Sequence, residues 1–404
     1  MLKQLFLAAL APLALAAPAS AIDLETRRLG EEIADRAEAF LRSRQDEETG
    51  AWALRPNGPQ FPAISALVLD GLLMDPRTDQ NDPQVARGID WVLSFRKPDG
   101  GIYDTLPDGT GVLSTYNTAI CLSMLTRVHS AEAGAAVQDG VALLKNLQWQ
   151  ESGSRMPDAP NAGEPVPESH PYYGGWGYGN HGRPDISNTQ FALQAFEDAG
   201  VSADDPAVQR ALVFLRRVQM HADVNDMPYA ESTRQGGFIY ATVPNAESVD
   251  SVPGQSQAGA FEETLPDGRT VRNWRSYGSV SYAGFKSLIF ADVPRDDPRI
   301  EAVLGWIREN YTLDTNPGMG DEGYYYYLLS FGRAMDALDS PTLEVAAGGE
   351  TREADWAADL IRTLATLQEP DGSFRVRSAR WMEDNDVLIT AYALIALHHA
   401  LGHD

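Results

Sequence analysis

The sequence predicts an all-α fold in which six helix–turn–helix units build two concentric rings of helices. Three observations support this prediction. An amphipathic helix, a turn rich in Gly and acidic residues, and a second, more apolar helix recur along most of the chain. The second helix of each unit is apolar on nearly all sides and requires burial, whereas the first keeps a charged face for solvent. Asp-Pro pairs open the first helix in three of the units.

The six copies follow one another along the chain. The outer, amphipathic helices include residues 40–45, 91–93, 143–148, 212–215, 304–307 and 360–364. The turns that follow them lie at residues 49–52, 99–103, 174–178, 236–240, 318–320 and 368–374. The inner, apolar helices include residues 64–69, 118–122, 189–193, 281–284, 324–329 and 390–394. Strand signals are weak and local, so helices dominate the prediction.

The starts of three outer helices are marked by the same pair of residues. Asp accepts hydrogen bonds from the free N–H groups at a helix start, and Pro fits the first helical position. The pairs occur at matching points of three copies: Asp82-Pro83, Asp205-Pro206 and Asp297-Pro298. Their recurrence supports the division of the chain into units.

The apolar end of the last copy favours a closed ring over an open solenoid. An open array of repeats needs polar capping units at its ends, but residues 393–397 read Ala-Leu-Ile-Ala-Leu. Two long inserts separate an outer from an inner helix, near 151–172 and 223–274, and both are rich in Pro, Gly, Ser and Asn. Because all such turns lie at one end of a ring, we expect these inserts to form a lid or rim over one mouth.

The N-terminal segment has the pattern of a signal peptide. Lys3 supplies a positive charge, residues 5–17 are apolar, and residues 19–21 read Ala-Ser-Ala, a small-residue cleavage site. The apolar run is too short for a membrane span. We therefore expect residues 1–21 to be removed and residues 22–404 to form a single domain in an exported, periplasmic or extracellular protein.

Composition excludes several classes of partner. The formal net charge is −25, with 57 acidic and 32 basic residues. Nucleic-acid binding and docking on anionic lipid both need clustered Lys and Arg, so we expect neither. The single Cys, Cys121, lies in an apolar run and cannot form a disulfide framework or a thiolate zinc cluster.

The last turn carries a motif that resembles a known superfamily. Residues 368–374 read Gln-Glu-Pro-Asp-Gly-Ser-Phe, which resembles the Gln-x3-Gly-x-aromatic repeat of the terpenoid cyclases and protein prenyltransferases, a group that includes squalene-hopene cyclases. Residues 45–52 resemble a looser copy with one extra residue, and further turns that resemble the motif lie at 99–103, 174–176 and 236–238. The resemblance covers nearly the whole chain after residue 21 and implies an α6/α6 toroid. It says less about function, because the same toroid serves cyclases, prenyltransferases, thioester-containing complement proteins and some polysaccharide lyases.

The residues that carry the chemistry of these relatives are replaced here. Squalene-hopene-type cyclases protonate an alkene with the central acid of an Asp-x-Asp-Asp-Thr motif. Residues 185–189 read Asp-Ile-Ser-Asn-Thr and residues 386–390 read Asp-Val-Leu-Ile-Thr, so both lack the two later acids. Protein prenyltransferases hold zinc with Asp, Cys and His, but Ile389 stands where the His of an Asp-x-x-His-Thr motif belongs. We expect neither standard squalene cyclisation nor a zinc site, and no other cofactor.

Candidate site residues follow from the inner-helix starts. Aligning the inner helices on their Thr or Ser places six residues at equivalent first positions, on one rim of the central cavity: Phe61, Ser114, Asp185, Tyr277, Asp321 and Asp386. The three carboxylates, Asp185, Asp321 and Asp386, are the candidate catalytic residues. The aromatic residues near them are candidate ligand contacts: Tyr116, Trp176, Tyr178, Tyr277, Tyr282, Tyr324, Tyr325 and Trp381. The alternative, in which each Asp caps its helix and the Tyr residues pack as core, stays open.

Three functions remain compatible with the sequence. The first is an exported toroid that binds, and transforms or only holds, an isoprenoid or similar apolar ligand in an aromatic cavity. The second is a glycan-binding or glycan-cleaving toroid, with Asp321 and Tyr324 as acid–base candidates. The third is a non-catalytic interaction scaffold whose inserts are contact loops. The motif departures favour binding over known cyclase chemistry.

Overall fold

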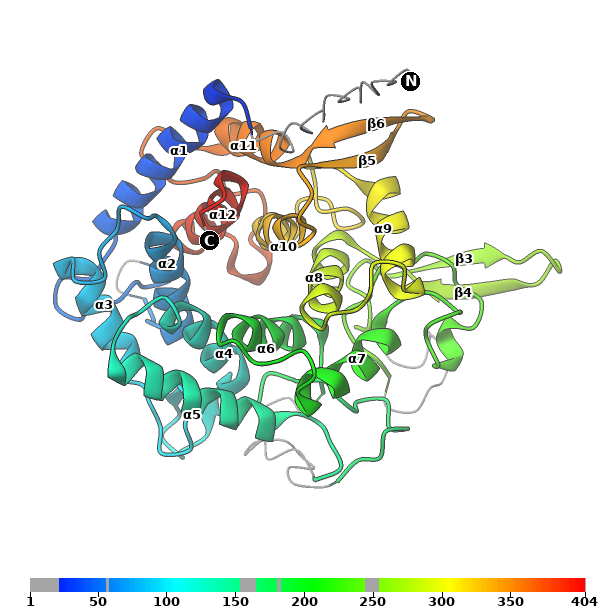
Figure 1. Cartoon of the computed structure of the whole chain (residues 1–404), viewed down its shortest axis with the longest axis horizontal. Helices are drawn as coiled ribbons and strands as arrows, with labels where there is room; N and C mark the ends of the chain where they lie inside the picture. The colour runs from blue at the N-terminus through cyan, green and yellow to red at the C-terminus, as the bar shows by residue number, and fades with distance from the viewer. Residues whose placement is uncertain (1–21, 56–57, 153–164, 180–182, 244–253, 404) are drawn as a thin grey trace, which may run out of the picture.

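Two concentric rings of α-helices form the molecule. The computed structural model describes residues 22–403 except 56–57, 153–164, 180–182 and 244–253, and within these residues twelve α-helices alternate between the rings (Figure 1). The inner ring consists of α2 (Pro62–Met74), α4 (Ser114–Leu125), α6 (Ile186–Asp198), α8 (Gly278–Phe290), α10 (Tyr324–Ala337) and α12 (Asp386–Leu401). The outer ring consists of α1 (Leu24–Ser43), α3 (Pro83–Leu93), α5 (Ala131–Leu147), α7 (Pro206–Val218), α9 (Pro298–Asn310) and α11 (Trp356–Leu367).

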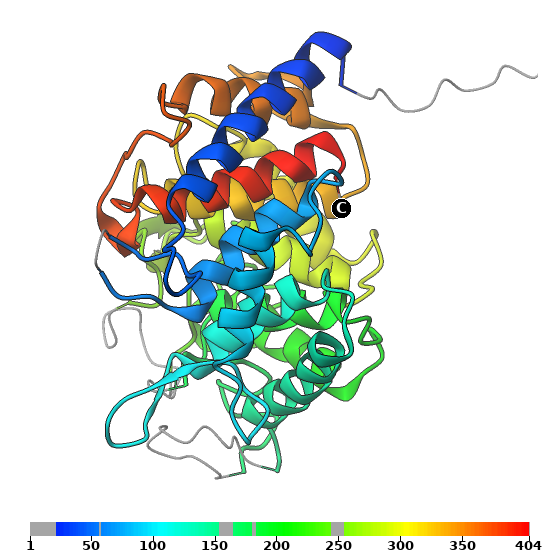
Figure 2. The same cartoon turned by 90° about the vertical axis from the view of Figure 1, so that its left-hand side faces the viewer.

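The inner ring is closed, as the apolar last repeat predicted. Each inner helix packs against the next, and α12 packs against α2. The turns before the inner helices gather at one end of the ring, on the left of Figure 2, and the inner helices end at the opposite side, where the C-terminus is marked. The inner-helix N-termini therefore form one mouth of the ring and their C-termini form the other.

The three Asp-Pro pairs cap outer helices as predicted. Each Asp is the N-cap residue, its carboxylate accepts a backbone N–H two residues on, and Pro occupies the first turn. These helices are α3, α7 and α9, capped by Asp82, Asp205 and Asp297, with donor–acceptor distances of 2.9 Å in each case. The caps set where each outer helix starts along the chain.

A Gln, buried in three copies and half-buried in the fourth, ties each of four turns to the next outer helix. Its side-chain amide donates two hydrogen bonds, one to the carbonyl of the first Gly of its own turn and one to a backbone carbonyl in the following outer helix. The pairs of acceptors are Gly50 and Gln84 for Gln45, Gly174 and Ala207 for Gln148, Gly236 and Arg299 for Gln219, and Gly372 and Ile33 for Gln368. The repeated Gln thus joins neighbouring units.

The link made by Gln368 closes the outer ring. Its Nε2 lies 2.9 Å from the carbonyl oxygen of Ile33 in α1, although the two residues are 335 positions apart. The Gly of that turn has a positive φ of 93°, and a Cβ at Gly372 would lie 2.2 Å from the Arg36 carbonyl oxygen. Only glycine allows the turn to approach α1 so closely. Arg27 adds a third contact by donating to the Leu401 carbonyl at 3.0 Å.

The hydroxyls that recur in the inner helices have a structural role. In four copies the hydroxyl oxygen accepts the backbone N–H of the apolar residue at the end of the turn, which fixes the turn on its own inner helix. The donor and acceptor residues are Trp52 and Ser65, Ile102 and Thr118, Trp176 and Thr189, and Phe238 and Ser281. The Thr of the Asp-Ile-Ser-Asn-Thr segment is one of these anchors.

Strands are confined to three antiparallel hairpins in the described part of the chain. They pair β1 (Asp104–Thr105) with β2 (Gly111–Val112), β3 (Ala260–Thr264) with β4 (Thr270–Trp274), and β5 (Thr342–Ala347) with β6 (Glu350–Asp355). The β3–β4 hairpin and a short 3₁₀ helix, η1 (Pro228–Ala230), belong to the 223–274 insert, and the hairpin projects outward beside the ring (Figure 1). A second 3₁₀ helix, η2 (Arg380–Met382), precedes α12.

Some expectations from the sequence concern residues outside the described ranges. The expected signal peptide, 1–21, lies wholly outside them, as do 153–164 and 244–253 within the two inserts. Among the helices described, none combines the length and the apolar character that crossing a membrane would require.

Candidate functional site

The predicted rim residues all lie at the mouth formed by the inner-helix N-termini. Asp185 and Tyr277 are the N-cap residues of α6 and α8, and Asp386 is the first residue of α12. Asp321 lies two residues before Gly323, the N-cap of α10. The alignment on Thr and Ser therefore located the starts of these helices to within two residues.

Asp185 is the one predicted carboxylate that is buried at this mouth. Only 1% of its surface is exposed. One carboxylate oxygen accepts the Asn188 backbone N–H at 2.8 Å and the other accepts the Asn188 side-chain amide at 2.9 Å. Burial raises the pKa of Asp185 to about 6, although the bonds from Asn188, the charge of Arg183 and a bond from Tyr240 oppose the shift. The carboxyl is therefore poised to gain or lose a proton near neutral pH.

A cluster of aromatic rings lies beside Asp185 in the centre of the ring. Successive ring centroids are 5.2–6.1 Å apart, and the rings come from α4, α6, α10, α12 and the turn before α6. In order of contact they are Tyr178, Tyr116, Phe191, Tyr326 and Tyr392. We call these five residues the aromatic cluster. Tyr116, Tyr178 and Tyr326 keep part of their surface accessible, whereas Phe191 and Tyr392 are buried.

Hydroxyl groups connect the aromatic cluster to its surroundings. The Tyr116 and Tyr392 hydroxyls are 3.4 Å apart, and the Tyr240 hydroxyl donates to that of Tyr178 at 3.2 Å. Tyr240 belongs to the 223–274 insert of the fourth copy. Its backbone carbonyl accepts the Ile186 N–H at 2.9 Å. Tyr240 therefore lies at this mouth, and the expected lid or rim role of the whole insert stays a prediction.

The run of four tyrosines divides between two roles. The hydroxyls of three of them donate to backbone carbonyls of surrounding loops: Tyr324 to Leu313, Tyr325 to Arg375 and Tyr327 to Thr312. Tyr326 instead turns into the ring, where its hydroxyl lies 3.0 Å from that of Ser187 and accepts the Gln190 amide at 3.3 Å. Tyr324 and Tyr325, which the sequence singled out, are thus structural in their contacts, whereas Tyr326 joins the aromatic cluster.

The other two predicted carboxylates form ion pairs with arginines on the rim. Asp321 is exposed and pairs with Arg377. Asp386 is partly exposed and pairs with Arg44 at 2.7 Å. The three aspartates share one mouth, but only Asp185 is recorded in electrostatic contact with the tyrosines of the aromatic cluster.

The remaining predicted aromatic residues are divided between core and surface. Trp176 is fully buried, and its indole N–H donates to the Leu144 carbonyl at 2.7 Å. Tyr282 is also fully buried, against Tyr327 and Phe331. Trp381 is 45% exposed and lies under the Arg380 guanidinium. Tyr277 is buried at the mouth. Burial is the main cause that raises the pKa of Tyr277, and the nearby Tyr326 and Asp185 raise it further.

A carboxylate that the sequence analysis missed, Glu383, lies next to Tyr326. It is 1% exposed, and its two oxygens accept the backbone N–H groups of Tyr325 at 3.2 Å and Tyr326 at 2.8 Å. Because Gly323 offers no side chain at the N-cap of α10, Glu383 caps that helix from another unit. Burial raises the pKa of Glu383 to about 7. The position of Glu383 shortly before the last inner helix was the feature of the sequence that could have indicated a carboxylate at this mouth.

Comparison with known proteins adds the family context. No protein-family model matches the chain. The curated relatives it matches are the squalene–hopene cyclase of Bradyrhizobium diazoefficiens, 27% identical over 198 residues, and a probable squalene–hopene cyclase of Sinorhizobium fredii, 24% identical over 192 residues. These matches cover 44% and 42% of this chain, and they span about a quarter of the relatives, 26% of each.

Solved structures share the fold over almost the whole chain. The type II terpene cyclase MstE from Scytonema has a TM-score of 0.53 at 15% identity, covering 94% of this chain and 99% of its own. The GH76A α-1,6-mannanase of Salegentibacter sp. HEL1_6 has a TM-score of 0.55 at 9% identity, covering 93% of this chain and 100% of its own. The chain has an α/α toroid fold similar to that of the terpene cyclase MstE. At these identities the two structures establish the fold of the toroid and leave its chemistry to its own residues.

In this toroid the position of the missing cyclase acid is occupied by a hydrogen-bonded hydroxyl. Ser187, which stands where the central acid of the cyclase motif belongs, pairs with Tyr326, and Asn188 is held by Asp185. Among the described residues of the toroid, no group of three or more His, Cys, Asp and Glu side chains is placed to hold a metal ion. The described residues bring together at this mouth two buried carboxyls, those of Asp185 and Glu383, with Tyr hydroxyls and aromatic faces.

Proposed function

We propose that this toroid binds an apolar, isoprenoid-like ligand at the mouth formed by the inner-helix N-termini. The observation that carries the proposal is the aromatic cluster, five contacting rings from four inner helices and one turn, with the buried Asp185 carboxyl beside it. Aromatic faces contribute large apolar contact area and attract cationic groups. Tyr hydroxyls and Asp185 add hydrogen-bonding groups that orient a polar end of the ligand.

The acid strength of Asp185 supports binding over alkene protonation. A carboxyl whose pKa is raised to about 6 is a weaker acid than an ordinary Asp, so it gives up its proton less readily. Protonation of an alkene needs a stronger acid, and Ser187 offers none at the motif position. A group with this pKa suits hydrogen bonding to the ligand or general acid–base transfer near neutral pH.

Three similar proteins support an isoprenoid ligand. The matched curated relatives are named squalene–hopene cyclases, and a structure of MstE is a complex with geranylgeranyl dihydroxybenzoate, described as its substrate. The expected signal peptide supports an exported protein that meets its ligand outside the cytoplasm. Fractionation of the producing cells tests export. The mass of the purified protein tests cleavage, since cleavage would start the chain at Ile22.

Thermal unfolding with two ligand panels tests the function. Polyprenyl alcohols and acids form one panel, and neutral and acidic oligosaccharides form the other. We expect the lipids to raise the Tm, with a stabilisation of about 2.7 kcal/mol at a hundred times the Kd. Asp185→Asn and Tyr326→Phe should weaken the effect, and Asp386→Asn, an ion-paired carboxylate on the same rim, is the matched control. A shift with oligosaccharides alone would overturn the proposal.

A second function, glycan binding or cleavage, is favoured by one specific observation. Two buried carboxyls with raised pKa values, Asp185 and Glu383, both lie next to Tyr326. Pairs of carboxyl groups perform glycoside chemistry, one as general acid and the other as base or nucleophile. The mannanase relative, solved in complex with α-1,6-mannotriose, supports this alternative. A Tm rise with a mannooligosaccharide that Glu383→Gln abolishes would select it.

A further inference from the structure

The opposite mouth of the ring holds a cavity that the proposed function does not use. Its volume is about 580 Å³, and its walls come from the C-terminal parts of all six inner helices and the residues that follow them. Small-molecule sites commonly have volumes of about 300–1,000 Å³. The cavity is lined by charged side chains rather than by aromatic ones, so it differs in character from the mouth beside Asp185.

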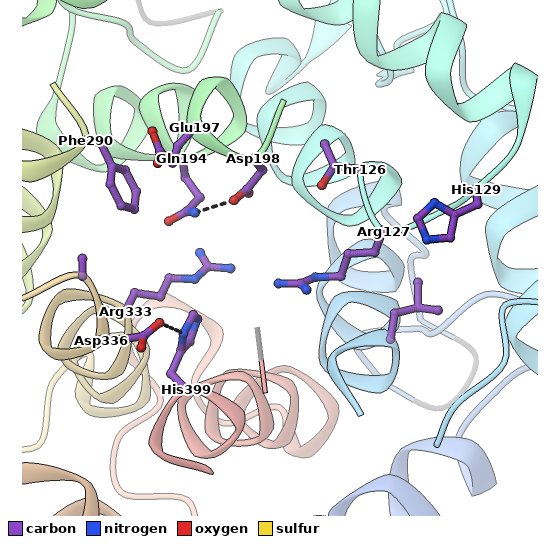
Figure 3. A pocket seen from close by; sticks show the side chains of 12 residues that line it. Thr126, Arg127, His129, Gln194, Glu197, Asp198, Phe290, Arg333, Asp336 and His399 are labelled. Carbon is purple, nitrogen blue, oxygen red and sulfur yellow. Dashed lines mark hydrogen bonds and ion pairs between the residues drawn. The ribbon is translucent and has the colours of Figure 1, made fainter. Parts of the chain in front are cut away.

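Two guanidinium groups share a single buried carboxylate in this cavity. Asp70 of α2 is 3% exposed and accepts Arg127 Nε at 2.8 Å and an Arg333 terminal N–H at 3.1 Å. Figure 3 shows the guanidinium groups of Arg127 and Arg333 pointing toward one another across the cavity. The charge of Arg333 also acts on Asp198 of α6, so the two guanidinium groups and the two aspartates form one charged network.

Arg333 keeps unused hydrogen-bonding capacity. Its side chain is 93% buried, and within the described part of the chain its Nε has no hydrogen-bond acceptor. A guanidinium has five N–H donors in a planar fork that matches a carboxylate. A buried donor without an acceptor is costly, so the arrangement is suited to an anionic group that the protein itself does not supply.

Carboxylates lie on the α6 side of the same cavity. Asp198 accepts the Gln194 amide at 2.8 Å, and Glu197 beside it is exposed at the cavity's edge. Burial raises the pKa of both carboxyls, and the positive charge of Arg333 opposes the shift of Asp198. Lys286 lies behind them, donating to Gln190 and Gln194 at 2.7 Å each, and burial holds the pKa of Lys286 well below its usual range.

Helix ends add negative character all round this mouth. The inner helices point their C-terminal carbonyl ends toward this mouth, and helix C-termini attract cations. On the opposite side of the cavity, Asp336 and His399 of α10 and α12 are already paired with each other at 2.8 Å (Figure 3). An ammonium group would therefore be attracted to Glu197 and Asp198, which line the α6 side of the cavity.

We propose that this cavity binds a small zwitterion of the amino-acid class, with its carboxylate on Arg333 and Arg127 and its ammonium group facing Glu197 and Asp198. A ligand with both charges matches both sides of the cavity. A simple anion would meet the carboxylates and the helix C-termini, and a simple cation would meet the two guanidinium groups. The apolar side chains of Leu73 and Phe290 complete the walls and offer contact to an aliphatic or aromatic side chain of the ligand.

Calorimetric titration of the purified full chain tests this site. The probes are the twenty standard amino acids, with acetate and methylamine as controls that each carry one of the two charges. We expect at least one amino acid to bind and neither control to bind at the same concentration. Binding of acetate as tight as that of every amino acid would overturn the assignment, as would heat from none of the probes.

Substitutions on the two sides of the cavity separate binding from folding. Glu197→Gln removes an exposed charge and should weaken the amino acid about tenfold, while the Tm without ligand stays unchanged. Glu309→Gln, an exposed carboxylate on α9 away from the cavity, is the matched control and should leave the Kd unchanged. Arg333→Lys keeps the charge but loses the fork, and should weaken binding further. An unchanged Kd in Glu197→Gln would contradict the proposal even if the Arg333 variant failed to fold.

Discussion

The hydroxyls of Tyr326 and Ser187 lie 3.0 Å apart and join α10 to α6 across the centre of the ring. Ser187 occupies the position of the central acid in the cyclase motif, so the contact replaces a proton donor by a pair of neutral hydroxyls. The same Tyr326 hydroxyl accepts the Gln190 amide at 3.3 Å. This contact positions one face of the aromatic cluster.

A double-mutant cycle measures that contact. Tyr326→Phe and Ser187→Ala should each lower the free energy of unfolding by about 1 kcal/mol, and the double variant should lose less than the sum. The expected coupling energy is about 0.5–1 kcal/mol, measured by urea unfolding of the four proteins. Purely additive losses would mean that the two hydroxyls do not depend on each other.

The proton of Asp185 should make stability depend on pH. The pKa of Asp185 is raised to about 6 from an ordinary 3.8, so the folded chain binds this proton more tightly than the unfolded chain does. The resulting stabilisation is fully present below about pH 4 and is lost as the pH rises through about 6. Relative to Asp185→Asn, the wild-type free energy of unfolding should therefore fall by about 2 kcal/mol between pH 4 and pH 7.

Urea unfolding of the wild type and Asp185→Asn at several pH values checks this dependence. The difference between the two proteins isolates Asp185 from other carboxyls, such as Glu38, whose pKa burial raises to about 8. If the free energies of unfolding of the two proteins change in parallel between pH 4 and pH 7, the proton affinity of Asp185 is the same in the folded and unfolded states.

Gln368 should be more important to stability than its place in a turn suggests. Gln368→Leu leaves the carbonyls of Ile33 and Gly372 without their side-chain donor and should lower the free energy of unfolding by about 2 kcal/mol. Chemical denaturation measures the loss. Gln209→Leu removes an exposed amide on α7 and should change stability by no more than about 0.5 kcal/mol; equal effects of the two substitutions would contradict the bridging role.

Glu383 should protect the first turn of α10. Glu383→Ala leaves the N–H groups of Tyr325 and Tyr326 without their acceptor, at a cost of about 1–2 kcal/mol. Amide hydrogen exchange of these two residues should accelerate about tenfold. Glu383→Gln keeps an acceptor and should show an intermediate rate, whereas an unchanged rate in Glu383→Ala would rule out the cap.

Patterns within each unit made the fold predictable from the sequence. The Asp-Pro pairs, the all-round apolar helices and the apolar last repeat are local features, and each corresponds to a helix start, an inner helix or ring closure in the structure. The β5–β6 hairpin was not predicted, because its strands are short and mostly exposed, which leaves little alternation of apolar and polar residues to read.

The candidate site was predictable only in part. Asp185 could be located because helix N-caps have a sequence signature. The choice of Tyr326 over Tyr324 or Tyr325 depends on how α10 is rotated against α6, since successive side chains on a helix point about 100° apart. Asp70 and Arg333 are 263 residues apart, and their contact exists only once the ring has closed. Asp70 and Arg333 are charged residues within otherwise apolar helices, and this pattern could have indicated that each has a charged partner inside the ring.

The contacts of Gln368 with Ile33 and of Arg27 with Leu401 have a consequence for how the chain unfolds. Since the two ends of the described chain meet in hydrogen-bonding contact, no unit is free to fray before the others, as the terminal units of an open array do. If the contacts between two neighbouring units are lost, the apolar inner helices of both units become exposed. This favours all-or-none denaturation. A circular permutant that joins the ends and opens a turn elsewhere would keep the contacts between all neighbouring units. It would change only which pair of units comes together last during folding.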